Sequence, residues 1–177
     1  MNITNNKRRK ESQDKIEHTF VELLQTHEIN EVSVTDICKL ANINRTTFYN
    51  NYMDIYDLAD KIKEKLERDV LELYSDEHMN GYNSNDFSKI FYLVKENPLF
   101  FKTYFKLGFD SSKIFEQNHL YDTNLSKKFY RDKHIDYHIE FFKAGFNAII
   151  KKWLDEGCQE SIEEMCHILK SEYSLKK

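Results

Sequence analysis

Four polar side chains between residues 45 and 50 have the chemistry to contact the edges of nucleic-acid bases. Arg45, Thr46, Tyr49 and Asn50 stand at positions i, i+1, i+4 and i+5, which share one face of an α-helix. A guanidinium can grip guanine with two hydrogen bonds and a carboxamide can grip adenine, whereas hydroxyl and phenol groups suit phosphates or thymine methyls. This face carries no mixture of Glu and Lys, which a merely solvated helix face usually shows. The residues therefore favour contact with DNA.

The opposite side of the same helix is expected to pack against the hydrophobic core. Phe48 and Tyr52 are four residues apart and are predicted to pack inward against Ile37, Leu40 and Phe20.

The segment 33–52 has the organisation of a helix-turn-helix. Ser33 and Asp36 form a capping-box-like start for the first helix, and residues 42–44 form a three-residue turn. The second helix is predicted from Arg45 to about Tyr52, with Asn44 as its N-cap.

Two longer helices are predicted to flank this segment. The preceding helix runs from about residue 13 to residue 27, with Ser12 as its N-cap. The following helix begins near Asp54 and carries an apolar stripe made of Leu58, Ile62, Leu66, Val70 and Leu73.

The remainder of the chain indicates an aromatic-rich helical body after a polar loop at 75–86. Helices are predicted at about 86–96, 98–107, 120–132, 135–156 and 161–173. Gly108 and Gly157 stand where helices should end, and Ser161 with Glu164 forms a capping box. The chain has 4 glycines and 1 proline, which argues against the many turns of a sheet protein, so the predicted fold class is all-α.

Composition places the chain among globular proteins of the cytoplasm. It has 177 residues, 40% of them hydrophobic, and a net charge of −4. No apolar run approaches the roughly 18 residues of a membrane span, so no membrane partner is expected. Three cysteines without a CxxC motif suit a reducing compartment. Lys7, Arg8, Arg9 and Lys10 form a basic tail that is either a solubilising terminus or an arm that touches DNA.

The stretch VSVTDICKLANINRTTFYNNYMDIYDLADKI (32–62) resembles the N-terminal domain of the tetracycline-repressor (TetR) family. The resemblance rests on the capped start at Ser33, the turn residue Ile43 and the TTFYNNY helix. One departure is Ile55, where many members carry a lysine directed at a phosphate. The resemblance implies DNA contacts from Ser33, Thr35, Asn44, Arg45, Thr46, Thr47, Tyr49, Asn50 and Asn51.

The segments FYLVKENPLFFKTYF (91–105) and FFKAGFNAIIKKWLDEGCQESIEEM (141–165) resemble a C-terminal type of this family that also occurs in dihydroxyacetone-kinase regulators. The resemblance implies a homodimer in which the last two helices of each subunit form a four-helix bundle. Apolar stripes on both helices agree with this, although they would also suit an ordinary core. The predicted interface comprises Phe142, Phe146, Ile149, Ile150, Trp153, Ile162, Met165 and Leu169.

The aromatic residues of the body also suggest a pocket for a small-molecule effector. Most must be core, because a small helical body needs large side chains to bury enough area. The candidates for the pocket are Phe91, Phe101, Tyr104, Phe105, Tyr137 and Phe141.

Other reactive residues give weaker indications. His134 and His138 are four apart but lack a convincing third ligand, so a surface pair is favoured over a metal site. Cys158 and Cys166 suit a structural role better than a redox switch. No nucleophile elbow, P-loop or dinucleotide fingerprint is present, so neither enzyme chemistry nor a cofactor is expected.

The sequence thus predicts a basic flexible tail (1–11), a DNA-binding domain (12–56), a connecting helix (57–74) and an effector-binding and dimerisation domain (75–177). The predicted function is regulation of transcription, with repression as the first expectation, by a homodimer that binds a palindromic operator and is released by an effector. The alternative is a coactivator or adaptor of the same fold that acts through a protein partner.

Overall fold

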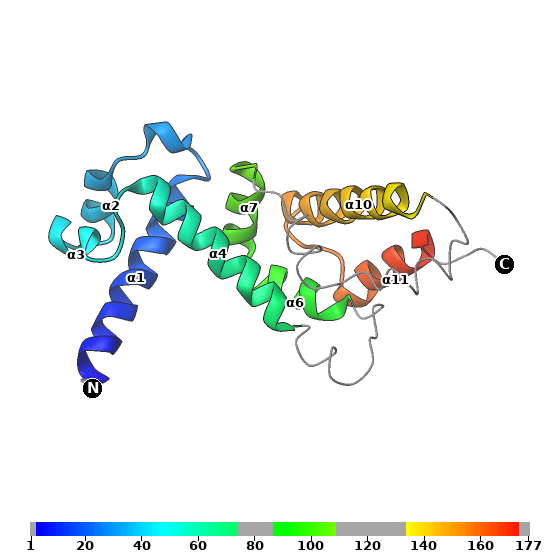
Figure 1. Cartoon of the computed structure of the whole chain (residues 1–177), viewed down its shortest axis with the longest axis horizontal. Coiled ribbons are helices and arrows are strands. Elements are labelled where there is room, and N and C mark those ends of the chain that lie inside the picture. The colour runs from blue at the N-terminus through cyan, green and yellow to red at the C-terminus, as the bar shows by residue number, and fades with distance from the viewer. Residues whose placement is uncertain (1–2, 74–86, 109–133, 174–177) are drawn as a thin grey trace. The chain divides into compact units, whose positions relative to one another are not determined.

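The computed structural model describes residues 3–73, 87–108 and 134–173, and every regular element in them is helical (Figure 1). The all-α prediction is therefore confirmed. The chain divides into two compact units, residues 1–65 and 66–177, with the boundary inside one helix, α4 (Ile55–Leu73). The predicted loop at 75–86 and the predicted helix at 120–132 lie outside the described residues.

The first unit contains α1 (Ile3–Leu23), a short 3-10 turn η1 (Ile29–Glu31), α2 (Val34–Leu40), α3 (Arg45–Tyr49) and the beginning of α4. Helix α1 packs on α2, and α2 packs on α3. The core of this unit is apolar and almost fully closed to solvent, because each helix turns one stripe inward. Its most deeply buried side chains are Ile16, Phe20, Val21, Leu24, Ile37, Phe48 and Leu58.

Three predictions for the first unit are wrong: the start of its first helix, the N-cap at Ser12 and the core position of Leu40. Helix α1 begins at Ile3, ten residues earlier than expected, so Lys7 to Lys10 belong to a helix rather than to a flexible tail. Lys, Arg and Glu are good helix formers, which favours this extension. Ser12 is not an N-cap, because it lies inside α1 and its hydroxyl donates to the Arg8 carbonyl.

The third wrong prediction concerns the core contact of α2. Leu40 is 62% exposed, and Cys38 is buried beside Ile37 instead. Helix α2 has only seven residues, so its inward face is narrow and its last residue has turned away from the core.

The second unit contains the rest of α4 together with α6 (Ser88–Glu96), α7 (Pro98–Lys106), α10 (Ile135–Asp155) and α11 (Ile162–Tyr173). Helix α10 packs against α6 and α7, and α11 packs against α6. Aromatic rings fill the interior: the Phe91 ring meets Trp153 edge-on at 5.4 Å between centroids and lies 6.3 Å from Phe146. Such edge-to-face pairs add to the stabilisation from area burial.

The predicted ends of these helices are confirmed. Gly108 and Gly157 follow the C-caps of α7 and α10 with φ angles of 67° and 79°, a region that costs glycine little. Ser161 and Glu164 exchange the two hydrogen bonds of a capping box at the start of α11.

Candidate nucleic-acid interface

The first helix of the motif starts as predicted. The Ser33 hydroxyl accepts a 3.2 Å hydrogen bond from the Asp36 backbone N–H and donates a 2.5 Å bond to the Asp36 carboxylate. The Ser33 and Thr35 side chains are exposed at this end of α2. The cap therefore fixes the start of α2 through the Ser33 hydroxyl and leaves the Thr35 hydroxyl facing solvent.

The turn and the second helix also follow the prediction, although the helix is shorter. Asn42 adopts a φ of 52°, which asparagine tolerates better than most residues. The Asn44 side-chain oxygen accepts hydrogen bonds from the backbone N–H and the hydroxyl of Thr47, at 2.7 and 2.9 Å. Helix α3 ends at Tyr49 rather than near Tyr52, and Asn50 is its C-cap.

The outer face of α3 presents the four side chains on which the sequence argument rests. Arg45, Thr46, Tyr49 and Asn50 are all exposed, with half of the Tyr49 surface open to solvent. Phe48 is fully buried behind them, and its ring lies edge-on to the Tyr49 ring at 5.6 Å between centroids. The helix therefore carries one anchored side and one free polar side.

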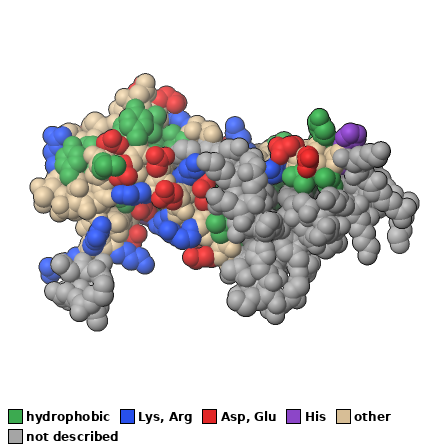
Figure 2. Space-filling view, viewed as in Figure 1, with side chains coloured by type: hydrophobic (Ala, Val, Ile, Leu, Met, Phe, Trp, Pro, Cys, Tyr) green, Lys and Arg blue, Asp and Glu red, His purple; other side chains and the backbone are tan. Residues whose placement is uncertain are grey.

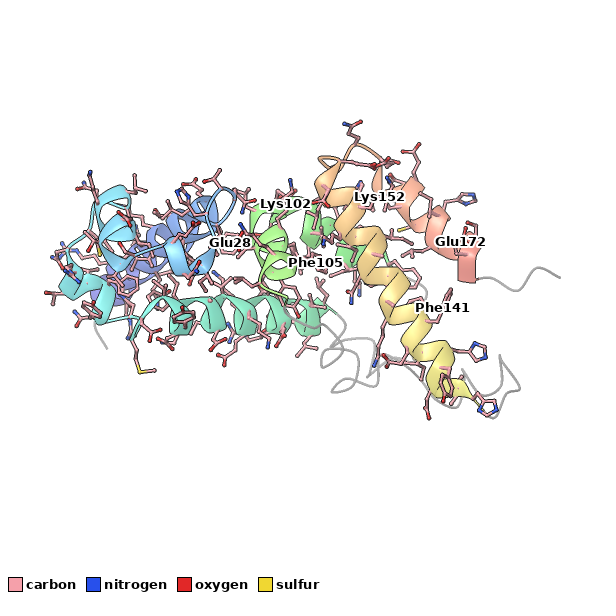
Figure 3. The ribbon with its side chains drawn as sticks, turned by 90° about the horizontal axis from the view of Figure 1, so that it is seen from above. Glu28, Lys102, Phe105, Phe141, Lys152 and Glu172 are labelled. Carbon is pink, nitrogen blue, oxygen red and sulfur yellow. The ribbon has the colours of Figure 1, made fainter. Side chains whose placement is uncertain are left out.

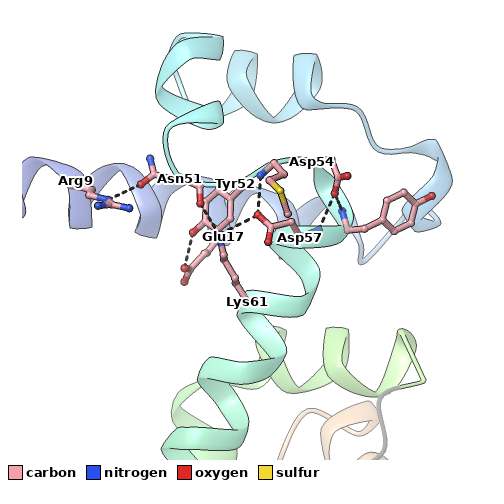
Figure 4. A network of polar contacts seen from close by, with 9 residues as sticks. Arg9, Glu17, Asn51, Tyr52, Asp54, Asp57 and Lys61 are labelled. Carbon is pink, nitrogen blue, oxygen red and sulfur yellow. Dashed lines mark hydrogen bonds and ion pairs between the residues drawn. The ribbon is translucent and has the colours of Figure 1, made fainter.

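Asn51 occupies a different place from the other predicted contact residues. Its side chain is 8% exposed, its oxygen accepts a 3.1 Å hydrogen bond from Arg9 Nε, and its amide donates to the Thr47 carbonyl at 2.8 Å. Its own carbonyl accepts from Lys61 Nζ at 2.9 Å (Figure 4). Asn51 thus connects α3 to both α1 and α4 from the inner side, and Thr47, which is half-buried, belongs to the same hydrogen-bonded line.

A buried carboxylate supports the end of this motif. Glu17 is 8% exposed, and its two oxygens accept hydrogen bonds from the Tyr52 hydroxyl at 2.9 Å and from Lys65 Nζ at 2.7 Å. Burial and the neighbouring Glu17 raise the pKa of Tyr52, so its phenol stays protonated as the donor. Glu17 was not among the predicted functional residues, although an acidic residue beside Ile16 on the inner side of α1 was a usable indication in the sequence.

The start of α4 is held by two aspartates. Asp54 Oδ1 accepts from the backbone N–H groups of Tyr56 and Asp57, at 2.8 and 2.9 Å. Asp57 in turn accepts from the Met53 N–H at 2.8 Å and from Lys61 at 3.1 Å, and these bonds, the Met53 bond first, lower the pKa of the Asp57 carboxyl. Ile55 is half-buried here.

Charge on the first unit is mixed. On the face shown in Figure 2, acidic and basic side chains lie interspersed over this unit rather than in one basic patch. On this face, contact with DNA would therefore depend on particular side chains rather than on a basic patch.

Comparison with known proteins identifies the type of chain. A family model described as "Transcriptional regulator C-terminal region" (TetR_C_8) matches residues 83–171, slightly more than half of the sequence. The chain belongs to the TetR family of transcriptional regulators. Its C-terminal region is of the kind found in DhaS, as the resemblance in the sequence implied.

One relative in the TetR family has a curated description. The "HTH-type dhaKLM operon transcriptional activator DhaS" of Lactococcus lactis subsp. lactis (strain IL1403) is 28% identical over 133 residues, which are 74% of this chain and 68% of that protein.

Solved structures share the TetR-family fold. The fatty acid degradation regulator FadR from Bacillus halodurans has a TM-score of 0.69 at 15% identity, covering 93% of this chain and 96% of that one. A TetR transcriptional regulator from Streptococcus agalactiae 2603V has a TM-score of 0.65 at 20% identity, with 96% and 97% covered. The dihydroxyacetone kinase operon activator DhaS has a TM-score of 0.55 at 21% identity, with 90% and 92% covered.

Two of the six aromatic residues predicted to line an effector pocket are exposed in the second unit of this TetR-family chain. Phe91, Phe101 and Tyr104 are buried and Phe105 is half-buried, whereas Tyr137 and Phe141 are 76% and 75% exposed. Phe141 stands out from α10 in Figure 3, which also labels Phe105 on α7. Tyr137 and Phe141 therefore do not line an enclosed site within the described part of the chain.

The predicted dimer interface consists mainly of residues that the subunit already buries. Six of its eight residues are buried inside the unit itself, and only Phe142 and Ile149 are half-buried. The Trp153 N–H, for example, donates to the Glu160 carbonyl at 3.2 Å while its ring packs on Phe91. The six core residues are Phe146, Ile150, Trp153, Ile162, Met165 and Leu169.

Family and fold are those of transcriptional regulators rather than enzymes. Across residues 3–73, 87–108 and 134–173, no group of three or more His, Cys, Asp or Glu side chains has the arrangement of a metal site. None of the helices in these ranges has the length and apolar character needed to cross a membrane.

Proposed function

We propose that this TetR-family regulator binds a specific DNA operator through the outer face of α3. The observation that carries the proposal is the exposure of Arg45, Thr46, Tyr49 and Asn50 on a helix whose other side is anchored by the buried Phe48. Such a helix can enter the major groove without losing its hold on the core. Arg45 and Asn50 are the base-reading candidates, because their side chains suit guanine and adenine.

Contacts to the DNA backbone come from residues around this face. Ser33, Thr35 and Asn44 are exposed. The Thr35 hydroxyl and the Asn44 amide can donate to phosphate oxygens, and the Ser33 hydroxyl can do so by turning away from the Asp36 carboxylate. Asn51, which is buried, holds α3 in place instead of touching DNA, and Thr47 shares that role.

The regulator acts as a homodimer through a face of α10 that differs from the predicted one. Tyr137, Phe141, Ala144 and Ala148 are exposed and follow one another at intervals of four, three and four residues. That spacing is typical of a helix seam in a bundle, and the two alanines allow close approach of a partner helix. Ile168, 39% exposed on α11, adds an apolar group from the last helix.

A two-fold dimer explains how a mixed-charge protein selects its site. Two copies of α3 can meet half-sites one helical turn apart, roughly 34–36 Å, so the operator is palindromic. Affinity then depends on two matched half-sites more than on a large basic surface. Release by a small-molecule effector stays a prediction.

The sign of regulation that we propose is activation, although repression was the first expectation. The curated relative, 28% identical over 74% of this chain, carries a description as an activator. A promoter fused to a reporter gene, measured with and without the regulator, separates the two: a rise in expression supports activation, and a fall supports repression.

The decisive experiment is selection of binding sites from random DNA, followed by gel shift across a salt series. We expect a palindromic consensus and an affinity that falls steeply as salt rises. The matched control is a variant with both Arg45→Ala and Asn50→Ala, which should lose the consensus but keep its fold. If no site is enriched by the wild-type protein, the alternative of an adaptor that acts through a protein partner is favoured.

A further inference from the structure

One arginine of α1 is joined directly to the end of the recognition helix. Arg9 donates from Nε to the Asn51 side-chain oxygen at 3.1 Å, and Asn51 donates to the Thr47 carbonyl at 2.8 Å. Thr47 donates to the Asn44 side chain at 2.9 Å. Polar contacts therefore lead from Arg9 through Asn51 and Thr47 to the N-cap of α3, and Figure 4 shows the first of them, from Arg9 to Asn51.

The positive charge of Arg9 is not neutralised by the residues that it contacts. Within the described residues, its hydrogen-bond partner is a neutral carboxamide, and no carboxylate forms an ion pair with it. If Arg9 only held α1 against α3, a neutral hydrogen-bond donor would serve as well as a charged one. Because Nε is engaged, the two terminal nitrogens of the guanidinium are held in a fixed direction and keep their donors for another acceptor.

The position of Arg9 suits an anion at the edge of the proposed DNA surface. Arg9 binds Asn51, and Asn51 directly follows Asn50, the last residue of the outer face of α3, so the guanidinium lies next to the chain segment in which that face ends. Arg9 is exposed, and Lys7, Arg8 and Lys10 on the same turns of α1 add positive charge. A planar, pre-oriented guanidinium is well matched to a phosphate group.

We propose that Arg9 binds a phosphate of the DNA backbone, and that Asn51 orients it for this contact. The contact would thereby fix where the DNA backbone lies relative to α3 in the groove. The inference rests on the proposed DNA-binding function and deepens it, because it assigns a second element, α1, to the same surface.

The test compares Arg9→Gln, Arg9→Lys and Arg8→Gln with the wild-type protein on the selected operator and on random DNA. Dissociation constants are measured by fluorescence anisotropy from 50 to about 300 mM salt, with thermal unfolding as a check of the fold. Arg8→Gln is the matched control, because it removes the same charge one position along α1, about 100° around the helix.

For a homodimer, Arg9→Gln should lower the slope of log affinity against log salt by about 2, one phosphate per subunit. The loss should be similar on operator and random DNA, and it should exceed the loss for Arg8→Gln. Arg9→Lys should keep most of the salt dependence but bind DNA more weakly, because lysine lacks the planar guanidinium that Asn51 orients. In an Asn51→Ala background, Arg9→Gln should cost less than it does alone.

An unchanged salt slope for Arg9→Gln, together with a lower unfolding temperature, would show that Arg9 is only a brace and would overturn the proposal. Arg9→Lys binding as tightly as wild type would overturn the role of Asn51. These outcomes require a wild-type protein that binds its selected operator. A wild-type protein that binds no DNA instead overturns the proposed function, and with it the assignment of Arg9.

Discussion

The Tyr52 hydroxyl donates a 2.9 Å hydrogen bond to Glu17, a carboxylate on α1 that is 8% exposed and 35 residues away in sequence. The bond joins the segment that follows the recognition helix to α1. Lys65 on α4 approaches the other oxygen of the same carboxylate at 2.7 Å. The interior of the DNA-binding unit is thus held by a polar group as well as by apolar packing.

Replacing Tyr52 with Phe should destabilise the first unit. The substitution leaves a buried carboxylate with one fewer donor, and loss of a hydrogen bond to a charged group costs about 1.5–3 kcal/mol. Urea unfolding followed by circular dichroism measures the change. Tyr49→Phe is the control, because the Tyr49 ring is half-exposed and its loss of a hydroxyl should change stability by less than about 0.5 kcal/mol. Equal effects of the two changes would contradict the role of Glu17.

Arg45→Ala should weaken operator binding and relax one position of the consensus. Loss of a two-bond contact to guanine costs about 1–3 kcal/mol of discrimination against the wrong base. Lys7→Ala is the comparison, since a lysine on α1 should affect all sequences alike. Competition binding with operators changed one base pair at a time gives both quantities. If Arg45→Ala weakens random DNA and operator equally, Arg45 contacts the backbone and not a base.

Local features of the fold could be predicted from the sequence because their partners are three or four residues apart. The Ser33–Asp36 and Asn44–Thr47 caps are of this kind, and the outer face of α3 follows from helix geometry alone. The contact between Arg9 and Asn51 spans 42 residues, and no periodic pattern encodes it. Asn51 therefore resembled a surface residue in the sequence, although the fold buries it.

The second unit was harder to predict because α10 is apolar on more than one side. Phe141 and Phe146 are equally apolar in sequence, yet one is 75% exposed and the other 6%. Burial within a subunit and burial against a partner require the same residue types, so composition does not separate core from interface. The packing of α10 on α6 and α7 determines which apolar side of α10 is buried inside the subunit.

Ala148→Glu should dissociate the proposed homodimer without unfolding the subunit. The change places two carboxylates in an apolar seam, and uncompensated charge there should raise the dimer dissociation constant about 100-fold or more. Analytical ultracentrifugation over a concentration series measures this shift. Tyr92→Glu is the control, because Tyr92 is a 55% exposed aromatic residue on α6, away from the seam. If only Tyr92→Glu dissociates the protein, the interface lies on α6.

Trp153→Ala should destabilise the second unit rather than its association. Trp153 is 1% exposed and packs on Phe91, so the truncation leaves a large cavity that costs about 3–5 kcal/mol. Chemical denaturation monitored by circular dichroism gives the loss, and Trp153→Phe should cost less because it keeps most of the ring contact. If the variant is as stable as wild type but monomeric, Trp153 contributes to the dimer interface instead of the core.

Asp57→Asn should change how stability depends on pH in the acid range. The bonds from Met53 and Lys61 lower the pKa of Asp57 in the folded protein relative to the unfolded chain. A carboxyl of this kind contributes stability that is fully present above its unfolded pKa, near 4, and is lost as pH falls through the folded pKa. Wild type should therefore exceed Asp57→Asn in stability at pH 7, and the difference should shrink below about pH 4.

Lys61→Met separates the two causes of that shift. It removes the ion pair with Asp57 and the bond to the Asn51 carbonyl, but it keeps the backbone bond from Met53, which is the larger influence on the pKa of the Asp57 carboxyl. The stability of Lys61→Met should therefore still fall as Asp57 is protonated, by less than in wild type and by more than in Asp57→Asn. Urea unfolding at a series of pH values from 7 to about 3 measures all three curves. If the difference between wild type and Asp57→Asn is constant over this range, Asp57 acts as a neutral cap, and the start of α4 does not depend on its charge.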